Sequence, residues 1–179
     1  MTYPAVVMRW TWRLALGACA ALLVVLGSPA TARAQSWMSD VQLGVATGLE
    51  GADTGTGVGW QRARTRLILS LDLGSDEHAQ DAYGFRTFVE LERSLSVGAE
   101  FGYVRWVIPE LNFFFGGVAV LAPRTLFGGT AAANYTFPLG KRVGIALFTS
   151  LSVLPLGSDR PGSGVVMWGL LGIGIRGRL

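Results

Sequence analysis

Charged side chains at alternating positions are the residues of this sequence that could do chemistry. Within each segment these charges are separated by an even number of positions. The seven are Arg62, Arg64, Arg66, Arg86, Glu90, Glu92 and Glu100. Because a strand sends successive side chains to opposite faces, these charges would gather on one face of a sheet. Unlike charges opposed across a sheet form ion pairs, and rings of charge set ion selectivity in pores. Ion pairing and ion gating are therefore the chemistries that this set supports.

General-base catalysis would have one histidine to use, His78. It lies in a polar connection beside Asp76 and Glu77, and no spaced His-Ser motif accompanies it. Hydrolysis or transfer of acyl chains usually needs a histidine base next to a serine or a carboxylate. A solvated turn histidine is the simpler interpretation. One histidine with scattered carboxylates also makes no transition-metal site, so we expect no enzymatic activity and no metal or cofactor.

The N-terminus has the features of an export signal. Basic residues precede an apolar run at 14–26, and Ala32 and Ala34 occupy the two positions that a signal peptidase reads. We predict cleavage before Gln35. An uncleaved anchor is the competing interpretation, but the apolar run has the length of a signal core and falls short of the roughly 20 residues of a spanning helix.

Cleavage divides the chain into a signal peptide, 1–34, and one domain, 35–179. Three arginines leave with the signal, which lowers the basic residues from 15 to 12, equal to the 12 acidic ones. The high pI therefore does not indicate nucleic-acid binding, and the arginines at 62–66 alternate with uncharged residues as on a strand face. The one cysteine, Cys19, also leaves, so the mature domain has no disulfide and no thiolate metal site.

A two-residue period runs through the mature domain and predicts eight strands. Gly, Pro, Asp and Ser fill the segments between them, as in turns. The expected fold is all-β, an eight-stranded antiparallel up-and-down barrel. The expected strands are 41–49, 60–73, 82–91, 95–105, 112–121, 127–137, 142–153 and 164–176.

One face of these strands is apolar and uncharged, and the other carries small or charged residues. An eight-stranded barrel has an interior only wide enough for packed side chains, which glycine, serine and a few charged groups would fill. Soluble surfaces are rich in mixed charge including lysine, whereas Lys141 is the one lysine of the sequence. We therefore expect the apolar face to meet lipid. The rival fold is a soluble lipid-binding barrel with its apolar face inside.

Three tyrosines provide an independent indication of a membrane. In an up-and-down order Tyr83, Tyr103 and Tyr135 fall at the same end of the barrel. Tyrosine belts mark the interfaces of a bilayer, so we expect an interface belt there. Ordinary strand aromatics are the alternative interpretation, because tyrosine is common in strands.

The export signal, the cysteine-free mature domain and eight runs of spanning length resemble the small eight-stranded outer-membrane barrel proteins of Gram-negative bacteria, the outer-membrane protein A/X/W-like barrels. In the final strand Leu171, Ile173, Ile175 and Leu179 recur at the alternate positions that the barrel-assembly machinery reads in such proteins. The resemblance implies an outer-membrane location, outer-membrane lipid as the surroundings and the assembly machinery as a partner during biogenesis.

The expected hairpin registers oppose unlike charges on the inner face. The pairs are Arg66 with Glu90, Arg64 with Glu92, and Arg86 with Glu100. A buried unpaired charge costs far more than the roughly 0.2–1 kcal/mol that an opposed pair contributes on a sheet, so we expect a packed, ion-paired lumen. The function expected is a non-enzymatic barrel that displays loops near 50–59 and 155–164. A narrow channel for small solutes or ions is the alternative, followed by a lipid-modifying enzyme.

Overall fold

The computed structural model describes residues 38–53, 58–74, 80–91, 95–158 and 164–179. The signal peptide, the cleavage site before Gln35, His78 and Glu92 lie outside these residues, and the predictions that concern them stay predictions. No helix in the described ranges is long and apolar enough to cross a membrane.

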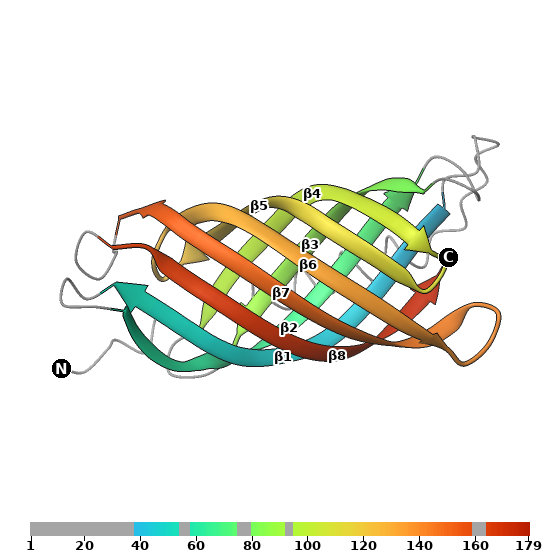
Figure 1. Cartoon of the computed structure of the whole chain (residues 1–179), viewed down its shortest axis with the longest axis horizontal. Helices are drawn as coiled ribbons and strands as arrows, with labels where there is room; N and C mark the ends of the chain where they lie inside the picture. Colours follow the sequence, from blue (N-terminus) through green and yellow to red (C-terminus); the bar gives the residue numbers. More distant parts are fainter. Residues whose placement is uncertain (1–37, 54–57, 75–79, 92–94, 159–163) are drawn as a thin grey trace, which may run out of the picture. The chain divides into compact units, whose positions relative to one another are not determined.

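Eight antiparallel strands follow one another around a closed barrel, and β1 pairs with β8 to complete it (Figure 1). The all-β class and the up-and-down order are confirmed. Several strands extend beyond their predicted ends, because the hairpin ladders continue toward the turns. The strands are β1 (Met38–Asp53), β2 (Val58–Gly74), β3 (Asp81–Glu90), β4 (Ser96–Ile108), β5 (Leu111–Ala122), β6 (Leu126–Pro138), β7 (Val143–Gly157) and β8 (Val166–Arg178).

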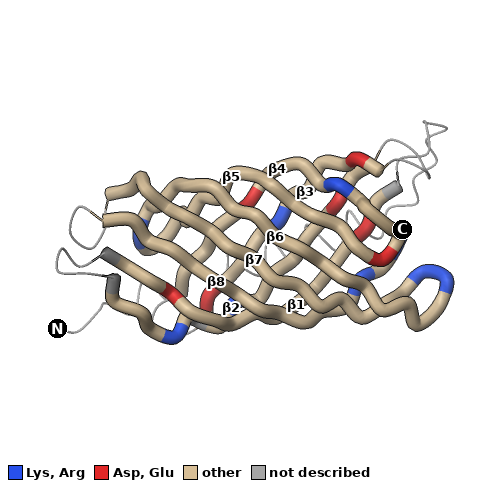
Figure 2. The backbone as a smooth tube through the Cα atoms, in the orientation of Figure 1, with Lys and Arg blue, Asp and Glu red and all other residues tan. Residues whose placement is uncertain are grey.

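The apolar face of the sheet points outward. From Val143 to Leu154 on β7 exposed and buried residues alternate, with Ile145, Leu147 and Leu151 exposed and Ala146 and Phe148 buried. Charged positions are scarce along β6, β7 and β8 and gather toward the strand ends (Figure 2). The soluble alternative required these aliphatic side chains to lie inside, so the outward placement excludes it.

A β-bulge changes the phase of β2. Ala46 pairs with Arg66, but Gly48 pairs with Ala63, so the β2 segment contains one residue more than the β1 segment facing it. Ala63 therefore takes the inward position and is buried, whereas Arg62 is exposed and stands opposite Leu49. The prediction that Arg62 faces the lumen is wrong, because the alternation on which it rested is interrupted at the bulge.

Small residues on the inner face make room for aromatic rings. A Cβ at Gly44 would stand 2.8 Å from Cε1 of Phe148, and a Cβ at Gly172 would overlap the same ring and lie 2.8 Å from the carbonyl oxygen of Val45. Gly98 is crowded in the same way by the ring of Phe88. The glycines of the inner face thus leave the space that large side chains from other strands occupy.

Adding a methyl group at Gly172 tests this packing. We expect Gly172→Ala to destabilise the barrel by about 1–3 kcal/mol, because overpacking forces the Phe148 ring or the backbone to shift. The measurement is the urea midpoint of unfolding.

Gly169→Ala is the matched control, since no atom lies within 4 Å of a Cβ built at Gly169 in the same strand. Equal midpoints for the two variants would contradict the packing described here.

Candidate functional site

Three arginines are buried in the lumen, and each of them contacts both a carboxylate and an aromatic ring. Arg66 comes from β2, Arg86 from β3 and Arg176 from β8, and all three are at most 6% exposed. A guanidinium is planar and weakly hydrated, so it can bind a carboxylate at its edge while its face lies on a ring. The lumen therefore contains three arrangements, each made of one arginine, its carboxylate partner and an aromatic ring.

Arg66 occupies the arrangement nearest the β1–β2 and β3–β4 connections. Its Nε donates a hydrogen bond of 2.8 Å to Oε1 of Glu90, and its Nη2 lies 2.6 Å from the same oxygen. The guanidinium carbon lies 3.7 Å from the ring centroid of Trp168 and 4.5 Å from that of Phe88. The cation thus lies against two rings that meet edge to face, and the β2–β3 register holds it directly opposite Glu90.

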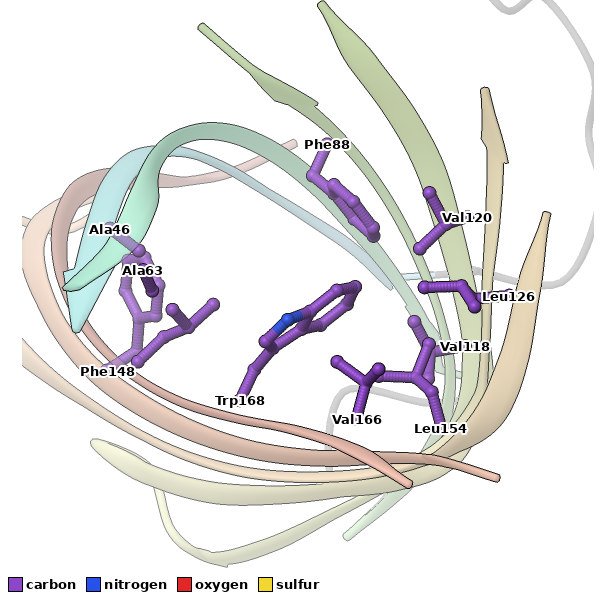
Figure 3. Packing of buried hydrophobic residues seen from close by; sticks show 11 residues of the cluster. Ala46, Ala63, Phe88, Val118, Val120, Leu126, Phe148, Leu154, Val166 and Trp168 are labelled. Atoms are coloured by element: carbon purple, nitrogen blue, oxygen red, sulfur yellow. The ribbon is translucent and has the colours of Figure 1, made fainter. Parts of the chain in front are cut away.

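Apolar side chains fill the lumen around this pair. Figure 3 shows Trp168 reaching across the barrel toward Phe88, and the two rings meet edge to face with centroids 6.4 Å apart. The remaining buried members of the cluster are Ala46, Ala63, Val118, Val120, Leu126, Phe148, Leu154, Val166 and Leu170. These apolar side chains lie across the lumen, where an ion path would need water.

Arg86 forms the middle arrangement. Its Nη1 lies 3.7 Å from Oε2 of Glu100, which faces it in the β3–β4 register. Its guanidinium carbon lies 3.9 Å from the ring centroid of Phe114, which is fully buried with Val104. The long distance to Glu100 indicates a weaker pair than that of Arg66, so the aromatic contact carries a larger share of the stabilisation.

Arg176 forms the third arrangement and joins three strands. Its Nη2 lies 2.7 Å from Oδ2 of Asp72 on β2 and 3.1 Å from Oδ2 of Asp40 on β1. Its guanidinium carbon lies 4.3 Å from the ring centroid of Trp106, and Arg178 approaches Asp40 at 3.5 Å. Neither Asp72 nor Arg176 belongs to the predicted lumen set. The register of β1 with β8 pairs Asp40 with Arg178 and Gln42 with Arg176, which is the signal that locates this arrangement.

The predicted lumen residues thus separate into two groups. Arg66, Glu90, Arg86 and Glu100 are buried as two pairs inside the barrel. Arg62 is exposed beyond the bulge and donates a hydrogen bond to Oγ1 of Thr65. The side chain of Arg64 and all of Glu92 lie outside the described residues. The aromatic partners were not predicted, because the expected inner face comprises small and charged residues only.

The three tyrosines of the predicted belt are exposed near one end of the barrel. Tyr83 faces Tyr103 in the β3–β4 register, and Tyr135 lies close to the β6–β7 turn. The hydroxyl of Tyr103 donates to Asp81, and Arg105 Nη1 lies 2.5 Å from the same carboxylate. Aromatic rings with polar groups beside them suit a water–hydrocarbon boundary, and the role of the tyrosines as an interface belt stays a prediction.

The described ranges contain no set of side chains suited to bind a metal ion. No group of three or more His, Cys, Asp or Glu side chains there could hold a metal ion. The carboxylates of the lumen are instead engaged by arginines, which occupy the positions that a cation would need.

Comparisons with known proteins support the fold. No protein-family model matches the sequence, and no curated protein matches it. Among solved structures, Ail, the attachment invasion locus protein of Yersinia pestis, superposes with a TM-score of 0.50 and 12% identity over 80% of this chain and 99% of Ail. Neisserial surface protein A gives 0.49 and 12% over 79% and 97%, and the outer membrane protease OmpT of Escherichia coli gives 0.45 and 8% over 81% and 97%. The resemblance to small eight-stranded outer-membrane barrels is confirmed at the level of the fold.

Breaking the most buried pair tests its role in stability. We expect Glu90→Gln to destabilise the barrel by about 3–5 kcal/mol, because Arg66 then remains charged in the lumen without its carboxylate. The urea midpoint of unfolding measures the loss.

Asp81→Asn is the matched control, since it removes the same charge from an exposed ion pair, where we expect little change. A similar fall in the urea midpoint of both variants would show that burial of the Arg66–Glu90 pair does not determine its contribution to stability.

Proposed function

We propose that this protein is an integral outer-membrane barrel with a plugged lumen, and that its role is structural or interactive and not catalytic. The observation that carries the proposal is the inverted placement of side chains: aliphatic groups cover the outside while arginines, glutamates and aspartates are enclosed. Soluble monomers rarely expose a contiguous apolar surface of more than a few hundred Å².

Closure of the sheet is the second support for a membrane location. In hydrocarbon every backbone polar group needs a partner within the protein, and a barrel without an edge strand meets this requirement. Strands of an outer-membrane barrel need about 9–11 residues to cross, and each of the eight strands reaches this length. The predicted export signal and the fold shared with Ail agree with this location.

The plugged lumen favours a display role over a channel. Arg66 lies 3.7 Å from the ring centroid of Trp168 and 4.5 Å from that of Phe88 inside the barrel. This packing supports a closed lumen, because an eight-stranded barrel has an interior only wide enough for side chains. Neighbouring connections at the end opposite the β6–β7 turn would then make the contacts with partners outside the cell. Surface contact is the kind of role that the name of Ail, an attachment protein, suggests for this fold.

Membrane insertion is tested by fractionation of the full chain expressed in a Gram-negative host. We expect the protein in the outer-membrane fraction, with a gel mobility that changes when the sample is boiled, because a folded barrel resists detergent until it is heated. A protein recovered in the soluble periplasm with no mobility change would contradict the proposal.

Conductance separates the plugged barrel from the channel. We expect planar bilayers that contain the wild type to show no steady current, and Glu90→Ala to remain silent as well, because removing the carboxylate leaves the rings of Phe88 and Trp168 across the lumen. Insertion is verified by boiling-dependent mobility. Steady ion-selective currents in Glu90→Ala over a silent wild type would favour a gated channel.

A further inference from the structure

A basic cavity lies at the end of the barrel that carries the β6–β7 turn. It has a volume of 170 Å³ and lies among the β6–β7 turn, the β4–β5 turn and the ends of β1 and β8. Its charged lining comprises Lys141, Arg142, Arg176, Arg178, Asp40 and Glu110. Four cationic groups thus meet two carboxylates, and the cavity has a net positive charge.

Two of the four cations are available to a ligand. Asp40 is engaged by Arg176 at 3.1 Å and by Arg178 at 3.5 Å. Lys141 and Arg142 are exposed on the turn, and no carboxylate in the described part of the chain forms an ion pair with either. They form the basic tip of the β6–β7 hairpin in Figure 2.

The turn that presents these cations is held in place by the backbone. The amides of Leu139 and Gly140 donate to the carbonyl oxygen of Val143 at 3.0 and 3.1 Å. The amide of Arg178 donates to the carbonyl oxygen of Arg142 at 2.9 Å, which ties the turn to β8. The backbone that carries Lys141 and Arg142 is therefore held at the edge of the cavity.

Apolar residues continue along the outside of the same hairpin up to the turn. Tyr135 and Phe137 are exposed and contact each other edge to face at 4.8 Å, and Leu139 is 68% exposed. Val143 is exposed where β7 begins. In a membrane Tyr135 and Phe137 would lie at the hydrocarbon boundary, and Lys141 and Arg142, further along the hairpin, would reach the level of the lipid phosphates.

We propose that the cavity and the β6–β7 turn bind the phosphate headgroup of an anionic phospholipid from the leaflet at this end of the barrel. The inference rests on the proposed membrane location. Lys141 and Arg142 donate charge-assisted hydrogen bonds to phosphate oxygens. The first carbons of the acyl chains lie against Tyr135 and Phe137. This apolar flank favours a lipid over a free anion, which would gain nothing from it.

The test compares lipid retention by the full-length barrel in nanodiscs of phosphatidylglycerol and phosphatidylcholine. We expect native mass spectrometry to find phosphatidylglycerol bound in preference to phosphatidylcholine on the wild type. The double variant Lys141→Gln/Arg142→Gln should retain it about tenfold less, because each cation near the surface of an anionic membrane strengthens binding several-fold. Both changes lie on an exposed turn, and boiling-dependent mobility verifies that the variant folds.

Arg124→Gln is the matched control, because Arg124 is an exposed arginine at the opposite end, on the β5–β6 connection. Unchanged retention in this variant supports the site at the β6–β7 turn. Equal retention by the wild type and the double variant overturns the inference, as does displacement of the lipid by inorganic phosphate at equal concentration, which would indicate a free-anion site. Failure of the wild type to enter nanodiscs would instead refute the membrane location on which the inference rests.

Discussion

Pairing of β1 with β8 is the constraint on which the rest of this structure depends. It removes both edges of the sheet, so each strand has two neighbours and one face of the sheet is cut off from the surroundings. Any charge on the enclosed face must then find its partner inside. The arginine and carboxylate pairs, the rings that cover them and the glycines that make space for those rings all follow from this closure.

The lumen replaces the hydrophobic core of a soluble protein with a mixed one. In each arrangement a ring lies against the face of an arginine while a carboxylate binds its edge, so the cation is shielded without being left unpaired. Asn112 and Asn134 share a hydrogen bond of 2.8 Å, and Ser152 donates to Thr130 at 2.9 Å, so neutral polar groups are also matched across neighbouring strands. Stability of such an interior depends on geometry, because a displaced partner leaves a charge behind.

The sequence was sufficient wherever the information is local. Alternation predicts the strands and their outward face, and short turns fix the registers that oppose Arg66 to Glu90 and Arg86 to Glu100. It was insufficient at Arg62, because a bulge depends on how two strands fit and leaves no residue signature in β2. The contacts of Arg176 were also missed, since they require knowing that the first and last strands meet. Phe88 and Trp168 were not predicted as lumen residues, because the expected inner face carries small and charged residues and these two are large and apolar.

The span of the Arg176 contacts has a consequence for the order of folding. Arg176 is 136 positions from Asp40 and 104 from Asp72. Contacts between such distant positions have a large entropic cost before they stabilise anything, whereas neighbouring hairpins form over short separations. We therefore expect the seam between β1 and β8 to close last, and before it closes Asp40 and Asp72 lack the cation of Arg176. At the membrane location proposed above, such an intermediate would bring two carboxylates without their cation against hydrocarbon, which would couple completion of the fold to entry into the bilayer.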